Sequence, residues 1–160
     1  MVIAIAPTKS SERFEWFLEK ATEIGVDRIV PLLCKNSERR SIKPERLSKI
    51  MIAAMKQSLK AWLPEITSLT LFEDLVRQPY DGSRFIATMS ASAEDHLSRL
   101  YPRGSDILIL IGPEGDFHSE EIRQASDNGF ISVNLGKSRL RTETAGIVAC
   151  HAINILNTCP

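Results

Sequence analysis

The apolar run Ile107–Ile111 limits the possible folds of this chain more than any other segment. A strand that is packed on one face alternates apolar and polar residues, whereas a strand that is covered on both faces is apolar throughout. Strands of the second kind are typical of parallel sheets with helices on both sides. The run therefore predicts a central strand of a parallel sheet.

Short apolar runs alternate with amphipathic segments along the rest of the chain. We expect strands at residues 2–6, 28–34, 66–71, 85–89, 107–111 and 131–135. We expect helices from Ser11 to Ile24, from Pro44 through Leu59, over 93–100, from Ser119 to Asn128 and over 142–157, with a short helical turn at 72–77. Ser11 and Ser119 are the expected N-caps, and Gly25 and Gly129 the expected ends. This order predicts one α/β domain, a mostly parallel sheet with helices on both faces.

Charge and composition exclude several classes of protein. The 160 residues carry 20 basic and 20 acidic side chains, so nucleic acid could be bound only through a local basic patch. The cysteines Cys34, Cys150 and Cys159 lack metal-ligand spacing, which indicates reduced thiols and no metal site. We expect a cytoplasmic protein without a membrane partner, because the first residues do not resemble a signal peptide and no apolar run reaches membrane-spanning length.

Two glycine-bearing segments follow predicted strands, IGPEGDF at 111–117 and LGKSRLRTETAG at 135–146. Neither has the spacing of a Walker loop or of a dinucleotide-binding turn. Gly112, Pro113 and Gly115 fix a bend from which Glu114 is free to project. Because ligands of open α/β sheets bind beyond the carboxyl ends of the strands, we expect these two segments to form a pocket.

Several charged residues near the two segments can be explained by structural roles rather than by ligand binding. Asp116, Glu120 and Glu121 suit the N-terminus of the following helix, where acidic groups favour the helix dipole. We expect His118 to be an exposed loop residue, and His151 to be hydrogen-bonded within the last helix rather than a metal ligand.

The second segment carries a cluster of cations, Lys137, Arg139 and Arg141, which suits phosphate groups; Glu143 could neutralise or orient Arg141. A solvated charge run followed by a helix cap is the alternative. Further basic residues lie in the stretch 35–43, which holds Arg39, Arg40 and Lys43, and at the end of the long helix. There Lys56, Gln57 and Lys60 precede Trp62, which could stack on a base or belong to the core.

With these segments identified, the chain resembles, almost end to end, the bacterial 16S ribosomal RNA uracil-N3 methyltransferase family of the SPOUT superfamily. The resemblance is carried by FLEKATEIGVDRIVPL at 17–32, SERRSIK at 37–43, QSLKAWLPEI at 57–66, and the two glycine-bearing segments. Two positions depart from the family pattern: Asp116 replaces a usual glycine, and Leu59-Lys60 replaces a usual Gly-Arg pair.

The resemblance implies a fold and an assembly. The C-terminal part of the sheet would be threaded into a trefoil knot, and the enzyme would act as a homodimer. Family members carry an additional N-terminal RNA-binding domain, related to PUA or OB-like barrels, which this sequence does not include. Residues 1–160 would accordingly be the methyltransferase domain.

The resemblance also implies an activity, S-adenosylmethionine-dependent methylation of N3 of a uridine in 16S rRNA, with the small ribosomal subunit as partner. A related enzyme acting on another RNA site, such as a ribose 2′-hydroxyl, and a non-catalytic RNA- or nucleotide-binding module are the alternatives. The cofactor would be bound by Thr88, Met89, Ile111, Gly112, Pro113, Gly115, Leu135, Gly136, Leu140, Thr142 and Ala145.

The same resemblance suggests roles for charged residues. Arg141 would bind a phosphate or a uracil oxygen as negative charge develops, Glu143 would orient it, and Glu114 would line the pocket. RNA would be bound by Arg39, Arg40, Gln57, Lys60, Lys137 and Arg139.

Overall fold

A parallel sheet is the framework of the chain. The computed structural model describes residues 1–158, so Cys159 lies outside the described residues. Within them, seven strands form the order β3-β2-β1-β6-β5-β7, with β4 also paired to β2, and every pair is parallel. The strands are β1 (Val2–Ile5), β2 (Arg28–Leu33), β3 (Glu65–Ile66), β4 (Thr70–Leu71), β5 (Ser83–Ala87), β6 (Ile107–Ile111) and β7 (Ile131–Val133). The central position predicted for β6 is confirmed.

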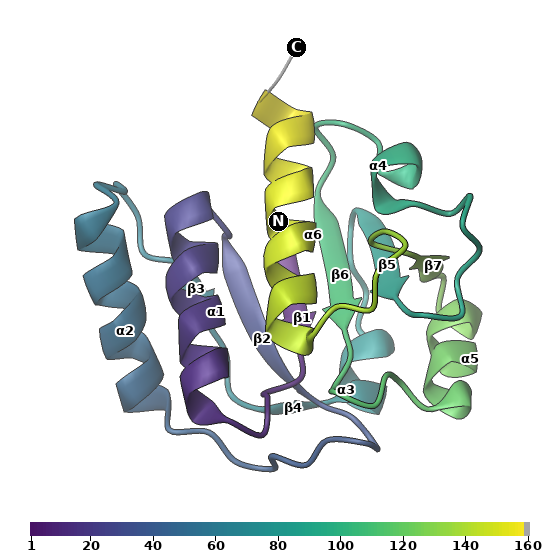
Figure 1. Cartoon of the computed structure of the whole chain (residues 1–160), viewed down its shortest axis with the longest axis horizontal. Coiled ribbons are helices and arrows are strands. Elements are labelled where there is room, and N and C mark those ends of the chain that lie inside the picture. Colours follow the sequence, from purple (N-terminus) through teal and green to yellow (C-terminus); the bar gives the residue numbers. More distant parts are fainter. Residues whose placement is uncertain (159–160) are drawn as a thin grey trace.

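Helices cover both faces of the sheet, as predicted. They are α1 (Ser11–Ile24), α2 (Pro44–Gln57), α3 (Phe72–Val76), α4 (Leu97–Leu100), α5 (Ser119–Asp127) and α6 (Thr142–Thr158). In Figure 1, α2, α1 and α6 stand side by side in front of the sheet, and α3 and α5 lie on its other side. The short α4 packs against α6.

The side chains of β6 divide the core into two layers. Ile107, Ile109 and Ile111 belong to the apolar cluster that contains the buried faces of α1, α2 and α6. Leu108 and Leu110 point the opposite way, into a second cluster with residues of α3 and α5. Both faces of the strand are therefore removed from water, which explains its uninterrupted apolar sequence.

A glycine allows α6 to lie close to the sheet. A Cβ atom at Gly146 would be 2.6 Å from a ring carbon of Phe17 and 2.8 Å from Cδ1 of Ile5. Contacts this short are repulsive, so only glycine fits where α6 meets α1 and β1. This packing fixes the beginning of α6, and with it the loop that precedes the helix.

Several predicted boundaries were wrong. The expected strand at 66–71 is divided into β3 and β4. Pro31 of β2 has no N–H to donate on the edge where Ile29 pairs with β3, so the hydrogen bonds between β2 and this segment are interrupted there. The expected strands at 85–89 and 131–135 end earlier, at Ala87 and Val133, and the expected helix at 93–100 is reduced to α4. The N-cap of α1 is Ser10 rather than Ser11.

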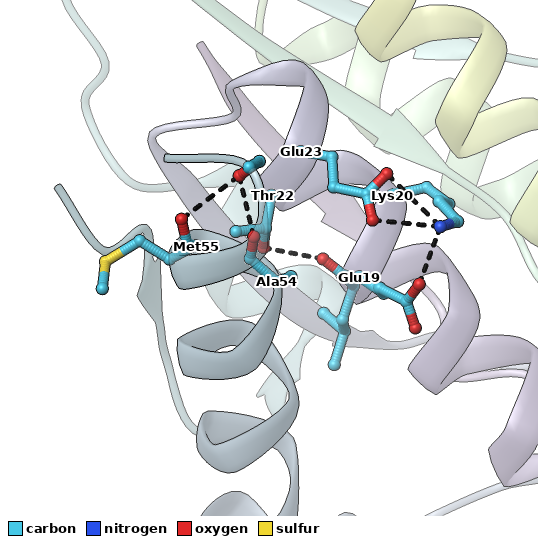
Figure 2. Close-up of polar contacts among 8 residues, drawn as sticks. Glu19, Lys20, Thr22, Glu23, Ala54 and Met55 are labelled. Atoms are coloured by element: carbon cyan, nitrogen blue, oxygen red, sulfur yellow. Dashed lines mark hydrogen bonds and ion pairs between the residues drawn. The ribbon is translucent and has the colours of Figure 1, made fainter. Parts of the chain in front are cut away.

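The polar contacts drawn in Figure 2 lie at the C-terminal ends of α1 and α2 and are local. Figure 2 shows Lys20 Nζ between the carboxylates of Glu19, at 2.7 Å, and Glu23, at 3.0 Å, all on α1. The hydroxyl of Thr22 donates to the Leu18 carbonyl oxygen one turn earlier. Because exposed ion pairs contribute at most about 1 kcal/mol, the association of α1 with α2 depends mainly on their apolar faces.

The connection from β7 to α6 bears on the implied trefoil knot. Figure 1 shows this segment curling beside β5 and β7 before α6 begins. Asn134 at its start donates its N–H to the Asp95 carbonyl oxygen, and its own carbonyl oxygen accepts from the N–H of Leu97. The segment is thus held by the loop that follows β5, and the knot itself stays a prediction. Among residues 1–158, none of the helices combines the length and the apolar character needed to cross a membrane.

Candidate functional site

A cavity of about 510 Å³ opens where β5, β6 and β7 end. Three loops line it: the residues after β5, the turn after β6, and the segment between β7 and α6. The carboxyl ends of neighbouring parallel strands meet at one edge of a sheet, which explains why segments far apart in the sequence form one cavity. Its volume is in the range of sites for small organic ligands.

The turn after β6 is a rigid wall. A Cβ atom at Gly112 would be only 3.0 Å from the Phe117 ring, so the turn folds tightly over this buried side chain. The carbonyl oxygen of Gly112 accepts from the hydroxyl of Thr142 at 3.0 Å, which joins the turn to the first residue of α6. Glu114 Oε1 accepts from the N–H of Lys9 at 2.9 Å. The expected bend is confirmed, but Glu114 is not free to project, because its carboxylate is bound to the loop after β1.

The wall after β5 is connected to this turn by Asp116. Its carboxylate accepts from Thr88 Oγ1 and from the N–H groups of Met89 and Phe117. The interpretation of Asp116 as a helix cap was therefore wrong. The cap of α5 is His118, whose ring nitrogen accepts from the N–H of Glu120, so the expected Ser119 cap was wrong. His118 is an exposed loop residue, as expected, and caps the helix in addition.

Glu121 completes the capping box of α5. Its side chain is buried, and its two oxygens accept from the N–H groups of Lys35 and His118 at 2.8 and 2.9 Å. The predicted position of Glu121 in the first turn is confirmed. The neighbouring Glu120 is exposed and pairs with Lys35, whose ammonium group lowers the pKa of that carboxyl.

The third wall is the segment before α6. The side-chain oxygen of Asn134 accepts from the N–H of Gly136 at 3.1 Å, and Gly136 has a φ of 125°, a backbone conformation that favours glycine. Lys137, Ser138 and Arg139 follow as exposed residues of the wall, and Leu140 is partly buried. This wall supplies most of the positive charge around the cavity.

The structure brings together the residues that the resemblance assigns to the cofactor. All of them except Gly115 line the cavity: Thr88, Met89, Ile111, Gly112, Pro113, Leu135, Gly136, Leu140, Thr142 and Ala145. Glu114 and the cations Lys137 and Arg139 also line it, whereas Arg141 and Glu143 do not. Arg141 is exposed immediately before α6.

Glu143 faces α1 and not Arg141. Its carboxylate is buried, with Oε1 3.8 Å from Nε of Arg13 and Oε2 without a hydrogen-bond partner in the described part of the chain. No ion pair with Arg141 is formed within residues 1–158. The expected orienting contact is therefore absent from this structure, because the first turn of α6 directs Thr142 toward the cavity and Glu143 toward α1.

The other expected RNA-binding residues lie outside the cavity. Arg39 donates to the carbonyl oxygens of Thr8 and Lys9, both at 2.9 Å, and thereby holds its loop on the segment after β1. Arg40 and Gln57 are exposed. Lys60 Nζ is 5.8 Å from the centre of the Trp62 ring, and Trp62 is 52% exposed, so it does not belong to the core.

Sequence reasoning missed several residues that line the cavity. Arg99 of α4, His96 before it and Asn134 after β7 lie there, and Arg99 adds a third cation to Lys137 and Arg139. Because a helix was expected over 93–100, no loop was expected at these residues. The pairing of His96 with Asn134 brings the loop before α4 next to the segment after β7. The signal that could have found them is the density of small and polar residues from Ser90 to Ser92.

The described residues hold no group of acidic, histidine or cysteine side chains that could bind a metal ion. Cys34 and Cys150 are free and buried, and burial raises the pKa of both thiols, that of Cys150 to about 12. Neither thiol is suited to act as a nucleophile.

Known proteins share this sequence and this fold. A structure described as a probable rRNA-methyltransferase from Porphyromonas gingivalis is 51% identical with a TM-score of 0.92, over 99% of this chain and 68% of that one. The ribosomal RNA small subunit methyltransferase E of Neisseria gonorrhoeae, bound to S-adenosyl methionine, is 28% identical with a TM-score of 0.84, over 98% of this chain and 65% of that one. The protein of the same name from Mesomycoplasma hyopneumoniae is 34% identical over 92% of this chain and 65% of its own length.

The likeness covers most of this chain but only part of its relatives. Among the curated relatives, the chain spans 53% to 65% of their length. The family described as RNA methyltransferase domain matches residues 1–154, which include β1 to β7, all three walls of the cavity and most of α6. The chain therefore belongs to the RNA methyltransferase domain family.

Proposed function

We propose that this chain is the methyltransferase domain of an enzyme that uses S-adenosylmethionine to methylate N3 of a uridine in 16S rRNA. The observation that carries this function is the cavity at the ends of β5, β6 and β7, which gathers almost every residue expected to bind the cofactor. Further support comes from the family and from the relative that is bound to S-adenosyl methionine.

The cavity fits the chemistry of this cofactor. S-adenosylmethionine supplies a methyl group on a positively charged sulfur. Gly136 lets the backbone approach an adenosine closely, and the carbonyl and N–H groups of the loops can pair with its polar edges. The acidic side chain of Glu114 and the cations Lys137 and Arg139 at the cavity provide partners for both charges of the methionine part.

The chain contributes mainly position to the reaction. Transfer to N3 requires the methyl group, its sulfur and the attacking nitrogen to lie in line, and holding them so lowers the barrier substantially. Arg99, Lys137 and Arg139 at the cavity can bind RNA phosphates, which favours a single-stranded or irregular region whose base can leave its stack. Arg141 lies beside this wall, where its charge can stabilise a uracil oxygen.

The same proposal includes the protein around the chain. Residues 1–160 act as the methyltransferase domain beside a separate RNA-binding domain, and two copies form a homodimer in the cytoplasm. The family resemblance supports the separate domain and the homodimer, and sedimentation of the purified protein tests the homodimer.

Cofactor binding and the methylated atom test the function. Calorimetry should show that the chain binds S-adenosylmethionine and its demethylated product. Small subunits from a strain lacking the gene should accept a methyl group, and mass spectrometry should place it on N3 of one uridine. A methyl group on a ribose 2′-oxygen would identify the related enzyme, and no binding of either cofactor form would exclude methyl transfer.

Arg141→Ala should separate catalysis from cofactor binding. Because Arg141 is exposed and does not line the cavity, the Kd for S-adenosylmethionine should change less than about threefold, whereas methyl transfer to rRNA should fall about 100-fold. Arg123→Ala, an exposed change on α5, is the control. Transfer by the Arg141 variant at the rate of the control would remove Arg141 from the mechanism.

A further inference from the structure

Asp116 has an unusual backbone conformation. Its φ is 65°, and among residues 1–158 Leu59 is the only other non-glycine residue with a positive φ. For an L-residue, this left-handed conformation costs about 1–2 kcal/mol of conformational free energy, although aspartate and asparagine tolerate it better than most residues. A residue kept in such a conformation at the edge of a ligand cavity calls for a compensating interaction.

The carboxylate of Asp116 provides that interaction. Oδ2 accepts from Thr88 Oγ1 at 3.0 Å and from the N–H of Met89 at 2.9 Å. Oδ1 accepts from the N–H of Phe117 at 2.8 Å. Hydrogen bonds to an ionised acceptor are about twice as strong as neutral ones, so one side chain supports three donors on two loops.

The two loops differ in how firmly they are held. The turn after β6 is fixed by the Phe117 ring under Gly112, by the N–H of Asp116 on the Pro113 carbonyl oxygen, and by Asn36 Nδ2 on the Asp116 carbonyl oxygen. On the other side, the Met89 side chain is exposed, and the Met89 N–H donates to Asp116 Oδ2. The loop after β5 is thus attached to the fixed turn largely through one carboxylate.

We propose that Asp116 is a positioning residue, which holds the loop after β5 against the turn after β6 at the spacing that the adenosine part of the cofactor requires. Both loops and Asp116 itself line the cavity, so their separation sets its width. This inference rests on the proposed use of S-adenosylmethionine. When the two loops are already held in place, the cofactor loses less binding free energy to ordering them, so its affinity is higher.

Two substitutions distinguish the carboxylate from the backbone. Glycine adopts a φ of 65° without strain but has no side-chain acceptor. Asp116→Gly therefore removes the three hydrogen bonds of the carboxylate without disturbing the backbone of the turn. Asp116→Asn tolerates the backbone conformation and keeps one oxygen, whereas its NH₂ group cannot accept from Met89 or Phe117. Asp127→Asn, an exposed change at the end of α5, is the matched control.

Hydrogen exchange and calorimetry give two independent measurements. In Asp116→Gly the amide of Met89 should lose its protection from exchange, while amides within β6 keep theirs. The Kd for S-adenosylmethionine should rise about tenfold in Asp116→Gly and by a smaller factor in Asp116→Asn, with Asp127→Asn at the wild-type value. Thermal unfolding without ligand should show that the glycine variant is folded.

Each contrary result has its own meaning. Unchanged Met89 exchange in Asp116→Gly would show that the carboxylate does not hold the loop, whatever the cofactor. Lost protection with an unchanged Kd would show that the contact does not position the ligand. If the wild-type chain bound no S-adenosylmethionine, the proposed function and this role would both fall, and the exchange result would show whether the loop contact itself exists.

Discussion

Leu59 combines an exposed apolar side chain with a backbone that suits glycine. Its φ is 54° and its side chain is 91% exposed. The N–H of Leu59 donates to the Lys56 carbonyl oxygen and the N–H of Lys60 to that of Met55, which is the pattern that ends a helix with a left-handed residue. Glycine is preferred at this position because a Cβ atom approaches the carbonyl oxygen in the left-handed conformation.

Replacing this residue should stabilise the protein. Leu59→Gly removes the backbone strain and an exposed apolar side chain, so the free energy of unfolding should rise by about 1 kcal/mol, measured by urea titration. Ala61→Gly in the same loop is the control, since Ala61 has no positive φ and should lose stability through chain entropy. A lower stability for Leu59→Gly would show that the left-handed backbone of Leu59 holds no strain that glycine relieves.

At the level of elements, Glu121 joins two parts of the fold. It completes the cap of α5 by accepting from the N–H of His118, and it also accepts from the N–H of Lys35 after β2. The Glu121 side chain is 3% exposed, and both contacts are partly buried. Glu120 next to it makes only exposed contacts, with Lys35 and His118.

Glu121→Ala and Glu120→Ala should therefore differ in stability. The first leaves two partly buried N–H groups without acceptors, and we expect the free energy of unfolding to fall by about 2 kcal/mol in urea titrations. The second should have a much smaller effect, because water screens an exposed pair. Since Lys35 lowers the pKa of Glu120, the contribution of that pair is present at neutral pH and is lost as the pH falls through the lowered pKa. Equal losses for the two variants would contradict this assignment.

The elements that could be predicted from the sequence are those whose pattern reflects burial. The run Ile107–Ile111 was predicted with its correct bounds because water is excluded from both of its faces. The single strand expected at 66–71 was wrong, because its pairing is interrupted by Pro31, which lies on β2 and not in the segment itself. The helix expected over 93–100 was too long, since its first residues are instead held by the segment around Asn134.

The candidate site was predicted in part for a similar reason. Glycines such as Gly112 and Gly136 mark loops in the sequence itself, so the walls after β6 and before α6 could be found. Contacts between distant loops leave no local pattern. For this reason the bond from Asp116 to Met89, the place of Arg99 and the orientation of Glu143 toward Arg13 emerged only from the fold.

At the level of the whole molecule, charge is distributed unevenly around a net value of zero. Arg99, Lys137 and Arg139 come from two separate segments and meet at the cavity, and within residues 1–158 none of the three forms an ion pair. A neutral protein has no long-range attraction to RNA, so the proposed RNA binding would depend on this cluster and on loops such as that of Arg40. Under the proposed function, the cluster would place the RNA beside the methyl donor.

The salt dependence of RNA binding measures this cluster directly. Each phosphate contact on single-stranded RNA contributes about 0.7 to the slope of log K against log salt concentration, so replacing Arg99, Lys137 and Arg139 together by alanine should reduce the slope by about 2. Alanine at Arg77, Arg103 and Arg123 gives the same net charge and should leave the slope nearly unchanged, because these exposed residues lie outside the cavity. Equal reductions in the two triple variants would mean that total charge, and not the cluster at the cavity, determines where the RNA binds.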